Sequence, residues 1–235
     1  MPLFLTSSPC DDDVPAGCEL PCIFFTRNGF VDNLRSCLPE NPRCLFVASA
    51  PDDIAFTDRV AEEMAACFYE AGMGFSELTR LDRRNQADAR LLIWESDFII
   101  LSGGHVPTQN AFFHKIHLPE LLRDYGGVVL GISAGSMNMA ATVYAQPEEP
   151  GESSPEYERF IPGLGLTDVN ILPHYQKVKD YTVDGLRLFE EITYPDSEGN
   201  CFFVLPDGSY IYQDEERLLL CGKGYSLADG IMQQL

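Results

Sequence analysis

A serine stands at the centre of the pentapeptide Gly131-Ile132-Ser133-Ala134-Gly135, with a glycine two residues away on each side. The apolar residues 127–132 precede it, and small residues and methionines follow from Ser136. This order is typical of a sharp turn from a buried strand into a helix, in which the serine hydroxyl projects above the sheet. Only small neighbours permit so strained a turn. We therefore predict that Ser133 is a nucleophile, although such a turn can also bind a phosphate or occur without function.

A serine nucleophile needs backbone N–H groups that stabilise the oxyanion formed in the reaction. The Ala134 N–H lies at the start of the predicted helix and can point towards that charge. A second N–H is expected from Ser102-Gly103-Gly104, which follows the apolar residues 97–101. Gly103 and His105, in the same segment, are candidates for contact with a substrate, although an ordinary turn is the alternative.

A serine hydroxyl also needs a base that accepts its proton. The chain has four histidines, and His174 follows the apolar residues 169–172 and a rigid proline, at a strand end where open α/β sheets place their sites. His114 and His117 are three residues apart in a predicted helix and lack a third metal ligand, so we treat them as ordinary helix residues. We predict His174 as the base and no metal site.

A carboxylate should orient the imidazole of this base. Asp207, in the turn Pro206-Asp207-Gly208-Ser209 after the apolar residues 201–205, is our candidate. A plain turn aspartate is the alternative, since Asp-Gly is common in turns. On an α/β-hydrolase fold the acid would precede the histidine, and Asp168 would then be the only aspartate between Ser133 and His174.

Short apolar runs alternate with segments of helical period, which indicates a three-layer α/β sandwich with a mostly parallel central sheet. The expected strands are residues 3–6, 44–48, 75–79, 97–101, 127–132, 169–172, 201–205 and 210–212. The expected helices are residues 31–38, 58–71 with Thr57 as N-cap, 87–94, 110–125 with a break near Pro119, and 183–193. Residues 146–157 are rich in proline, glycine and glutamate, so we expect an exposed loop there that borders the active site.

The length, charge and cysteine content of the chain indicate its domain organisation, its partners and its location. At 235 residues the chain is expected to form one domain, residues 1–235. A formal net charge of -20 disfavours nucleic acid and anionic membranes as partners. The N-terminus has no apolar run of the signal-peptide kind, so we expect a cytoplasmic protein. Eight scattered cysteines do not form a disulfide framework, and we expect free thiols, with Cys18 and Cys22 as the pair that could otherwise suggest a metal.

Together these residues resemble the peptidase E family of serine peptidases, which includes the cyanophycinases and has a fold similar to class I glutamine amidotransferases. The family motifs occur here in the family order as Leu5-Thr6-Ser7-Ser8, Gly103-Gly104 with Thr108-Gln109, the pentapeptide at Ser133, Gly163-Leu164-Gly165-Leu166, and Pro173-His174. The resemblance covers most of the chain. It implies Ser133 as nucleophile, His174 as base, and the Gly104 and Ala134 backbones as oxyanion donors.

The resemblance has two departures. The family acid is usually a glutamate, and Asp207 stands at the matching place, so the backbone must approach the histidine more closely. Aspartyl dipeptidases of the family carry an arginine where Val183 stands in this chain, so we expect a specificity that is not strictly aspartyl. Lys177, Lys179 and Arg187 are candidate replacements for that arginine.

The expected activity is hydrolysis of a small peptide or amide through an acyl-enzyme, without metal or organic cofactor. A glutamine amidotransferase would need cysteine in place of Ser133. A binding or sensing protein with an incomplete triad, on the same scaffold, is the alternative from another class. The sequence leaves a homodimer open.

Overall fold

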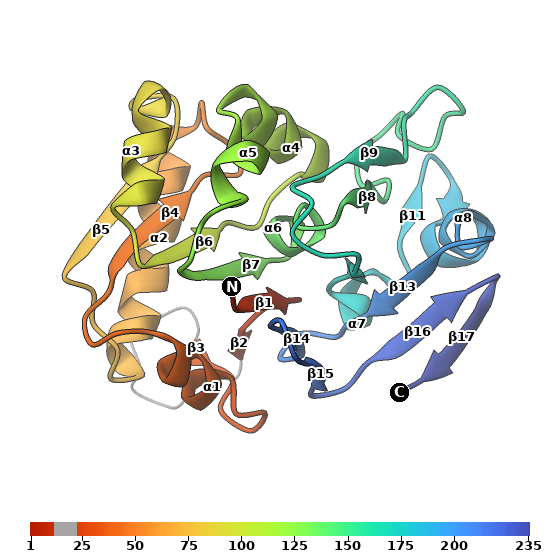
Figure 1. The fold of residues 1–235 in the computed structure, drawn as a ribbon. Coiled ribbons are helices and arrows are strands. Elements are labelled where there is room, and N and C mark those ends of the chain that lie inside the picture. The colour runs from red at the N-terminus through yellow and green to blue at the C-terminus, as the bar shows by residue number, and fades with distance from the viewer. Residues whose placement is uncertain (12–22) are drawn as a thin grey trace.

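The computed structural model describes residues 1–11 and 23–235. Its centre is a seven-stranded sheet in the order β15-β14-β1-β7-β6-β4-β5 (Figure 1). The strands that run parallel to one another are β1 (Leu3–Thr6), β7 (Val128–Ile132), β6 (Phe98–Leu101), β4 (Arg43–Val47) and β5 (Glu77–Leu81). At one edge, β14 (Tyr210–Gln213) and β15 (Leu218–Cys221) continue the sheet in antiparallel pairing. The predicted mostly parallel α/β sheet is confirmed.

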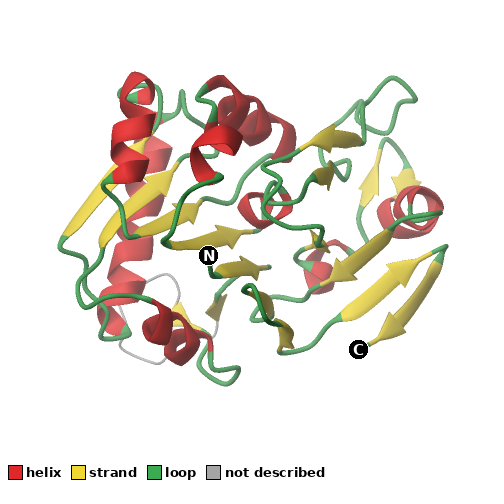
Figure 2. Ribbon diagram, viewed as in Figure 1, coloured by secondary structure: helices red, strands yellow, loops and turns green. Residues whose placement is uncertain are grey.

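Helices cover both faces of this sheet (Figure 2). In β1, Leu3 and Leu5 pack into one core and Phe4 into the other, because successive side chains of a strand point to opposite faces. The first core is covered by α3 (Ala89–Trp94), α4 (Val106–Lys115), α5 (Leu118–Leu122) and α6 (Ala134–Met137), and the second by α1 (Phe30–Cys37) and α2 (Ile54–Glu70). Full burial of a Leu or Phe side chain stabilises the fold by about 1.5–3 kcal/mol. The molecule is therefore layered helix, sheet, helix around this sheet.

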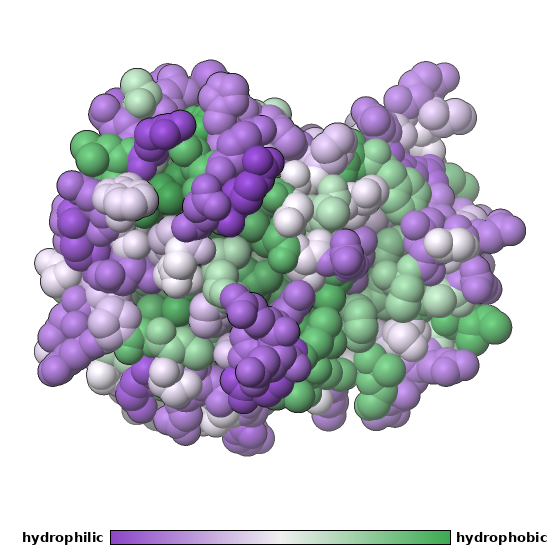
Figure 3. Space-filling model, viewed as in Figure 1, coloured by the Kyte–Doolittle hydropathy of each residue, from purple (hydrophilic) through white to green (hydrophobic). Residues whose placement is uncertain are grey.

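A second sheet lies beside the first, in the order β10-β13-β16-β17 (Figure 1). These strands are β10 (Asn170–Leu172), β13 (Cys201–Val204), β16 (Tyr225–Ala228) and β17 (Ile231–Gln234). Because β10 and β13 are parallel and Leu172 pairs with Val204, the segments that follow both strands leave at the same end. In Figure 3, hydrophobic residues reach the surface in the region of β16 and β17, where Ile231 is exposed.

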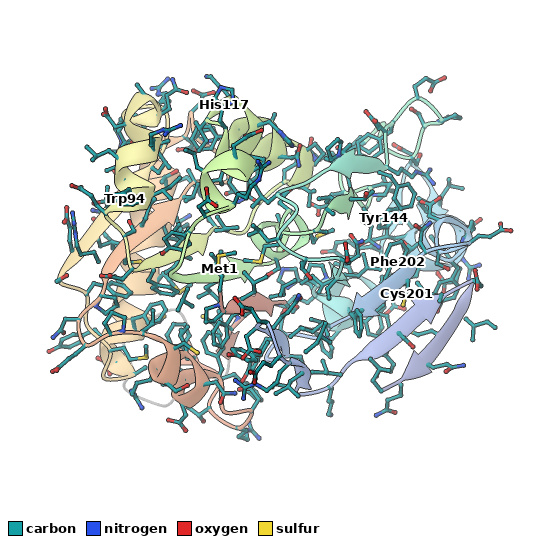
Figure 4. All side chains as sticks on the ribbon, in the orientation of Figure 1. Met1, Trp94, His117, Tyr144, Cys201 and Phe202 are labelled. Carbon is teal, nitrogen blue, oxygen red and sulfur yellow. The ribbon has the colours of Figure 1, made fainter. Side chains whose placement is uncertain are left out.

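Short elements complete the described structure. Between α6 and β10 along the chain, β8 (Thr142–Tyr144) pairs with β9 (Phe160–Pro162), and Tyr144 stacks on Phe202 with ring centroids 4.7 Å apart (Figure 4). The others are β2 (Cys10–Asp11) with β3 (Ile23–Phe24), the 3-10 turn Gln86–Asp88, and α7 (Tyr175–Val178). Residues 146–157 contain neither helix nor strand, as expected for a loop.

The start of α2 differs from its prediction. The helix begins at Ile54, and the Asp53 side chain accepts a hydrogen bond of 2.9 Å from the Phe56 N–H. Asp53 is therefore the N-cap, and the prediction of Thr57 was wrong. Thr57 lies one turn inside the helix and is buried.

The predicted helix of residues 110–125 is two helices. The first, α4, begins at Val106, because Pro107 fits the first turn of a helix. The break lies at His117, whose φ of 58° is left-handed, and Pro119 falls in the first turn of α5.

The prediction of a helix from residue 183 was wrong in its first half. β11 (Thr182–Val183) and β12 (Leu186–Arg187) form a hairpin around Asp184 and Gly185, which both have positive φ. Asp-Gly strongly favours such a two-residue turn. Only Leu188–Thr193 is helical, with π geometry, and α8 (Tyr194–Asp196) follows it.

Cys37, Cys44, Cys201 and Cys221 are free thiols, as expected. The prediction for Cys18 and Cys22 lies outside the described residues. Among the helices of the described residues, none combines the length and the apolar character needed to cross a bilayer.

Candidate active site

Ser133 lies in a tight turn between β7 and α6. Its φ of 51° and ψ of -115° are unfavourable for a residue with a side chain. Its N–H donates to the carbonyl oxygens of Thr6 and Ser7, both at 3.0 Å, and this holds the turn against the end of β1.

The two glycines around Ser133 are required by close packing. A Cβ at Gly131 would lie 2.6 Å from Ser136 Cα, and one at Gly135 would lie 2.2 Å from the carbonyl oxygen of Leu101. The glycine spacing on which the prediction rested therefore has a steric cause at both positions.

His174 follows β10 and Pro173 and precedes α7. Its backbone is left-handed, with φ 57° and ψ 27°, so the chain turns sharply there. Its Nε2 lies 2.9 Å from Ser133 Oγ, although the two residues come from different sheets. The side chain is 30% exposed, which leaves room for a substrate to reach this pair.

Asp207 lies beyond the end of β13, next to His174. Its Oδ1 is 2.6 Å from His174 Nδ1, which is the other side of the ring from Ser133. Because an ionised carboxylate only accepts, Nδ1–H is the donor, and Nε2 is free to accept from the serine hydroxyl. Asp168 is exposed and is not among the hydrogen-bond partners of His174 in the described chain.

Four side chains donate to the Asp207 carboxylate. Oδ1 accepts from His174 and from Ser7 Oγ at 2.8 Å, and Oδ2 accepts from Gln176 Nε2 at 2.6 Å and from Lys177 Nζ at 3.0 Å. Burial opposes the charge of Asp207, but the hydrogen bonds from His174, Lys177 and Ser7 and the charge of His174 outweigh it and hold the pKa of this carboxyl well below its usual range. Asp207 is therefore ionised at neutral pH and can stabilise a protonated imidazole.

Sequence reasoning missed Ser7 and Gln176 as neighbours of Asp207. Gln176 holds both the carboxylate of Asp207 and its backbone N–H, the latter at 3.0 Å through Oε1. It lies two residues after His174, and that proximity was the only local signal. Ser7 was visible as part of Leu5-Thr6-Ser7-Ser8, but nothing in that stretch indicates a partner 200 residues away.

The Gly103-Gly104 turn lies against Ser133. A Cβ at Gly103 would be 3.5 Å from Ser133 Cβ, and one at Gly104 would be 2.5 Å from Ser49 Oγ. Among the described residues, no hydrogen-bond acceptor is found for the backbone N–H of either Gly104 or Ala134. Both N–H groups can therefore donate to a ligand.

His105 ties the loop of residues 146–157 to this turn. Its ring nitrogens lie 2.8 Å from Thr108 Oγ1 and 2.8 Å from Glu152 Oε1. Glu152 Oε2 also accepts from the N–H groups of Glu148 and Glu149 at 2.8 and 3.0 Å. Ligand atoms of His105, Glu149 and Glu152 lie within 4.8 Å of one another, a spacing that suits a cation, but the contacts of Glu152 within the protein already account for both of its oxygens.

The remaining histidines do not form a pair. His114 belongs to α4 and its Nε2 lies 3.0 Å from the carbonyl oxygen of Pro162, whereas His117 precedes α5. They do not share one helix face, and the prediction of His117 as a helix residue was wrong, because it lies in the turn between α4 and α5.

Comparison with known proteins identifies the family of the chain. The model of peptidase family S51 matches residues 26–220. No curated protein sequence matches the chain. A peptidase from an acI-B1 actinobacterium has a similar solved structure, with a TM-score of 0.62 at 16% identity over 100% of this chain and 93% of the other. A Listeria monocytogenes EGD-e protein that bears the name putative peptidase E gives a TM-score of 0.60 at 17% identity, over 100% and 98% of the two chains.

These two likenesses show that the fold is that of peptidase E proteins. The family model spans well over half of the sequence, and so this chain belongs to peptidase family S51 and is a serine-type peptidase.

Proposed function

We propose that the protein cleaves a small peptide through an acyl-enzyme, with Ser133 as nucleophile, His174 as base and Asp207 as the acid that orients the base. One observation carries this proposal. Ser133 Oγ, the two nitrogens of His174 and Asp207 Oδ1 form a continuous hydrogen-bonded row, with distances of 2.9 and 2.6 Å. Both distances lie within the reach required for proton transfer and for orientation of the ring.

The reaction follows from this row. As Ser133 Oγ attacks the carbonyl carbon of the scissile bond, its proton passes to His174 Nε2, and Asp207 stabilises the resulting imidazolium. The carbonyl oxygen becomes an oxyanion that accepts from the Gly104 and Ala134 N–H groups. His174 then gives the proton to the leaving amine, the C–N bond breaks, and a water molecule activated by His174 releases the acyl group.

The substrate side of the proposal is a small peptide without a strict requirement for aspartate. Val183, at the place of the family's arginine, is buried in β11 and cannot bind a carboxylate. The candidate replacements have partners within the protein: Lys177 binds Asp207, Lys179 lies 3.8 Å from Asp180, and Arg187 lies 3.4 Å from Glu191. Gly103 and His105 remain our candidates for contact with the peptide backbone.

We also propose, from the net charge, that the protein does not bind nucleic acid. At -20, the chain lacks the positive field that a binder of nucleic acid needs.

The test is covalent labelling with a fluorophosphonate, which reacts with activated serines, followed by hydrolysis of a panel of dipeptides that differ at the first residue. We expect the wild-type protein to be labelled and Ser133→Ala to lose both labelling and hydrolysis. Ser36→Ala, an exposed serine on α1, is the control and should behave as wild type. Labelling that persists in Ser133→Ala, or a wild-type protein without labelling or hydrolysis, contradicts the proposal and favours a binding protein on this scaffold.

A further inference from the structure

Ser7 is hydrogen-bonded to all three residues of the row described above. Its carbonyl oxygen accepts from the Ser133 N–H at 3.0 Å. Its hydroxyl accepts from the His174 backbone N–H at 2.7 Å and donates to Asp207 Oδ1 at 2.8 Å. The residue is completely buried, at 0% exposure, so water does not replace these contacts.

The direction of these hydrogen bonds is fixed by chemistry. The Asp207 carboxylate can only accept and the His174 N–H can only donate. The Ser7 hydroxyl therefore donates a hydrogen bond to Asp207 and accepts one from the His174 N–H. A side chain that could only donate, or only accept, would satisfy one partner and leave the other unpaired in a buried place. A hydroxyl of this size meets both requirements.

Ser7 also lies where the two sheets meet. It follows directly after β1, which pairs with β7 of the nucleophile on one side and with β14 on the other. Its own N–H donates to the carbonyl oxygen of Ser209, two residues after the acid, at 3.2 Å. The base and the acid follow β10 and β13 of the second sheet, so their position relative to Ser133 depends on contacts that cross between the sheets.

We propose that Ser7 is a positioning residue that holds His174 and Asp207 in register with Ser133. This inference rests on the proposed function, because it assigns a role relative to the same three residues. Ser7 does not touch the reacting atoms. It acts through the position of the ring and through the charge of the carboxylate.

Ser7→Ala is expected to have two separable effects. Loss of both hydroxyl contacts lets His174 and Asp207 move, and a displacement of about 1 Å at a reacting group lowers the rate by about 10²-fold. Loss of the O–H donor also concentrates the negative charge of Asp207 on the imidazole, which favours its protonated form. The acidic limb of the pH–rate profile should therefore move to higher pH.

The other ionisable groups near His174 are not substituted in this variant. Lys177 contacts Asp207 from α7, and Glu148 and His105 lie on the loop and turn that face the site. A change in the limb can therefore be assigned to the Ser7 hydroxyl.

Ser197 provides a matched control. It is also at 0% exposure, and its hydroxyl also donates once and accepts once, to Tyr194 O at 2.7 Å and from Gly230 N at 2.8 Å. Ser197→Ala removes a buried hydroxyl with the same two kinds of hydrogen bond at a position that does not contact Ser133, His174 or Asp207. Ser7→Cys keeps the approximate shape of serine but replaces a strong donor with a weak one, and serves if Ser7→Ala does not fold.

The experiment measures the second-order rate of fluorophosphonate labelling against pH, with the thermal midpoint as a check of folding. We expect Ser7→Ala to react about 10²-fold more slowly than wild type, with its acidic limb at higher pH, and Ser7→Cys to react about tenfold more slowly than wild type. Ser197→Ala should lose stability but label within about twofold of wild type.

Two results would overturn the inference in different ways. A folded Ser7→Ala or Ser7→Cys that labels within about threefold of wild type, with an unmoved limb, removes the role of Ser7 alone. A wild-type protein that is not labelled at all removes the proposed function, and the role of Ser7 with it.

Discussion

Replacement of Asp207 by asparagine tests the proposed role of this carboxylate as the acid that orients His174. The two carboxylate oxygens accept from four donors, two on each oxygen. An amide has one oxygen and one NH₂ group, so in either orientation its NH₂ faces two donors. If the NH₂ faces His174, Nδ1 of the ring must accept a hydrogen bond from the new amide, so the ring proton must be on Nε2. Nε2–H then faces Ser133, and this tautomer cannot accept the proton of the serine hydroxyl.

The magnitude follows from these two orientations. Where the asparagine oxygen faces His174, the charge that stabilises the imidazolium is still lost, and where the NH₂ faces it, the base is also lost. In a Ser-His-Asp triad the same change lowers kcat by about 10⁴-fold. We expect Asp207→Asn to lower kcat by about 10³–10⁴-fold, which corresponds to roughly 4–5.5 kcal/mol of transition-state stabilisation.

The assay is kcat and kcat/KM for the best dipeptide of the panel, with fluorophosphonate labelling as a second measure. Asp168→Asn is the matched control, because this exposed aspartate precedes His174 in the chain and would be the acid of an α/β-hydrolase arrangement. It should leave kcat within about twofold of wild type. If Asp207→Asn keeps a rate within about tenfold of wild type, or if Asp168→Asn is the variant that fails, the assignment of the acid is refuted.

Three further outcomes are expected from the same structure. Gly135→Ala should lower the free energy of unfolding, measured in urea, by about 3 kcal/mol, because its Cβ would lie 2.2 Å from the Leu101 carbonyl oxygen. Gly126→Ala is the control and should change this free energy little, since nothing lies within 4 Å of its Cβ. Equal effects of the two substitutions would contradict this account. Lys177→Met removes one of the four donors to Asp207 and leaves the His174, Ser7 and Gln176 contacts in place, so fluorophosphonate labelling should stay within about tenfold of wild type; a loss of about 10³-fold or more would refute this account. Because the pKa of Asp207 is lowered in the folded protein, the ionised carboxylate should stabilise the fold above about pH 3.9, and this stabilisation should be lost as the pH falls further. The difference in the free energy of unfolding between wild type and Asp207→Asn, measured in urea, should therefore shrink in acid rather than stay constant.

Much of the first sheet could be predicted from the sequence because its signals are local. Continuous apolar runs at β6 and β7 are typical of strands buried on both faces, and the structure has them within one residue of the predicted bounds. The structure also brings together Ser133, His174 and Asp207, each of which was chosen from its own few neighbours.

The second sheet could not be assigned from the sequence. β10 and β13 were expected as strands, but a short apolar strand carries no information about its partner. The pairing of β10 with β13, and of β13 with β16, rather than with β1, depends on side chains far apart in the chain. Ser7 was missed for the same reason, since its hydroxyl contacts are 167 and 200 residues away in sequence.

Errors in the helices came from competition between local signals. Helical periodicity over residues 183–193 was outweighed at its start by the Asp184-Gly185 turn, where two positive φ values fix a hairpin. At α2 a capping aspartate, Asp53, extended the helix by one turn beyond the residue that the pattern favoured.

Asp207 lies on the chain segment that leaves β13 of the smaller sheet and enters β14 of the larger one. A slight separation of the two sheets would thus move His174 and Asp207 away from Ser133 while every helix stays intact. Gentle heating or dilute denaturant should therefore abolish hydrolysis before circular dichroism detects any loss of secondary structure. Hydrolytic rate becomes the more sensitive gauge of how firmly the two sheets are docked.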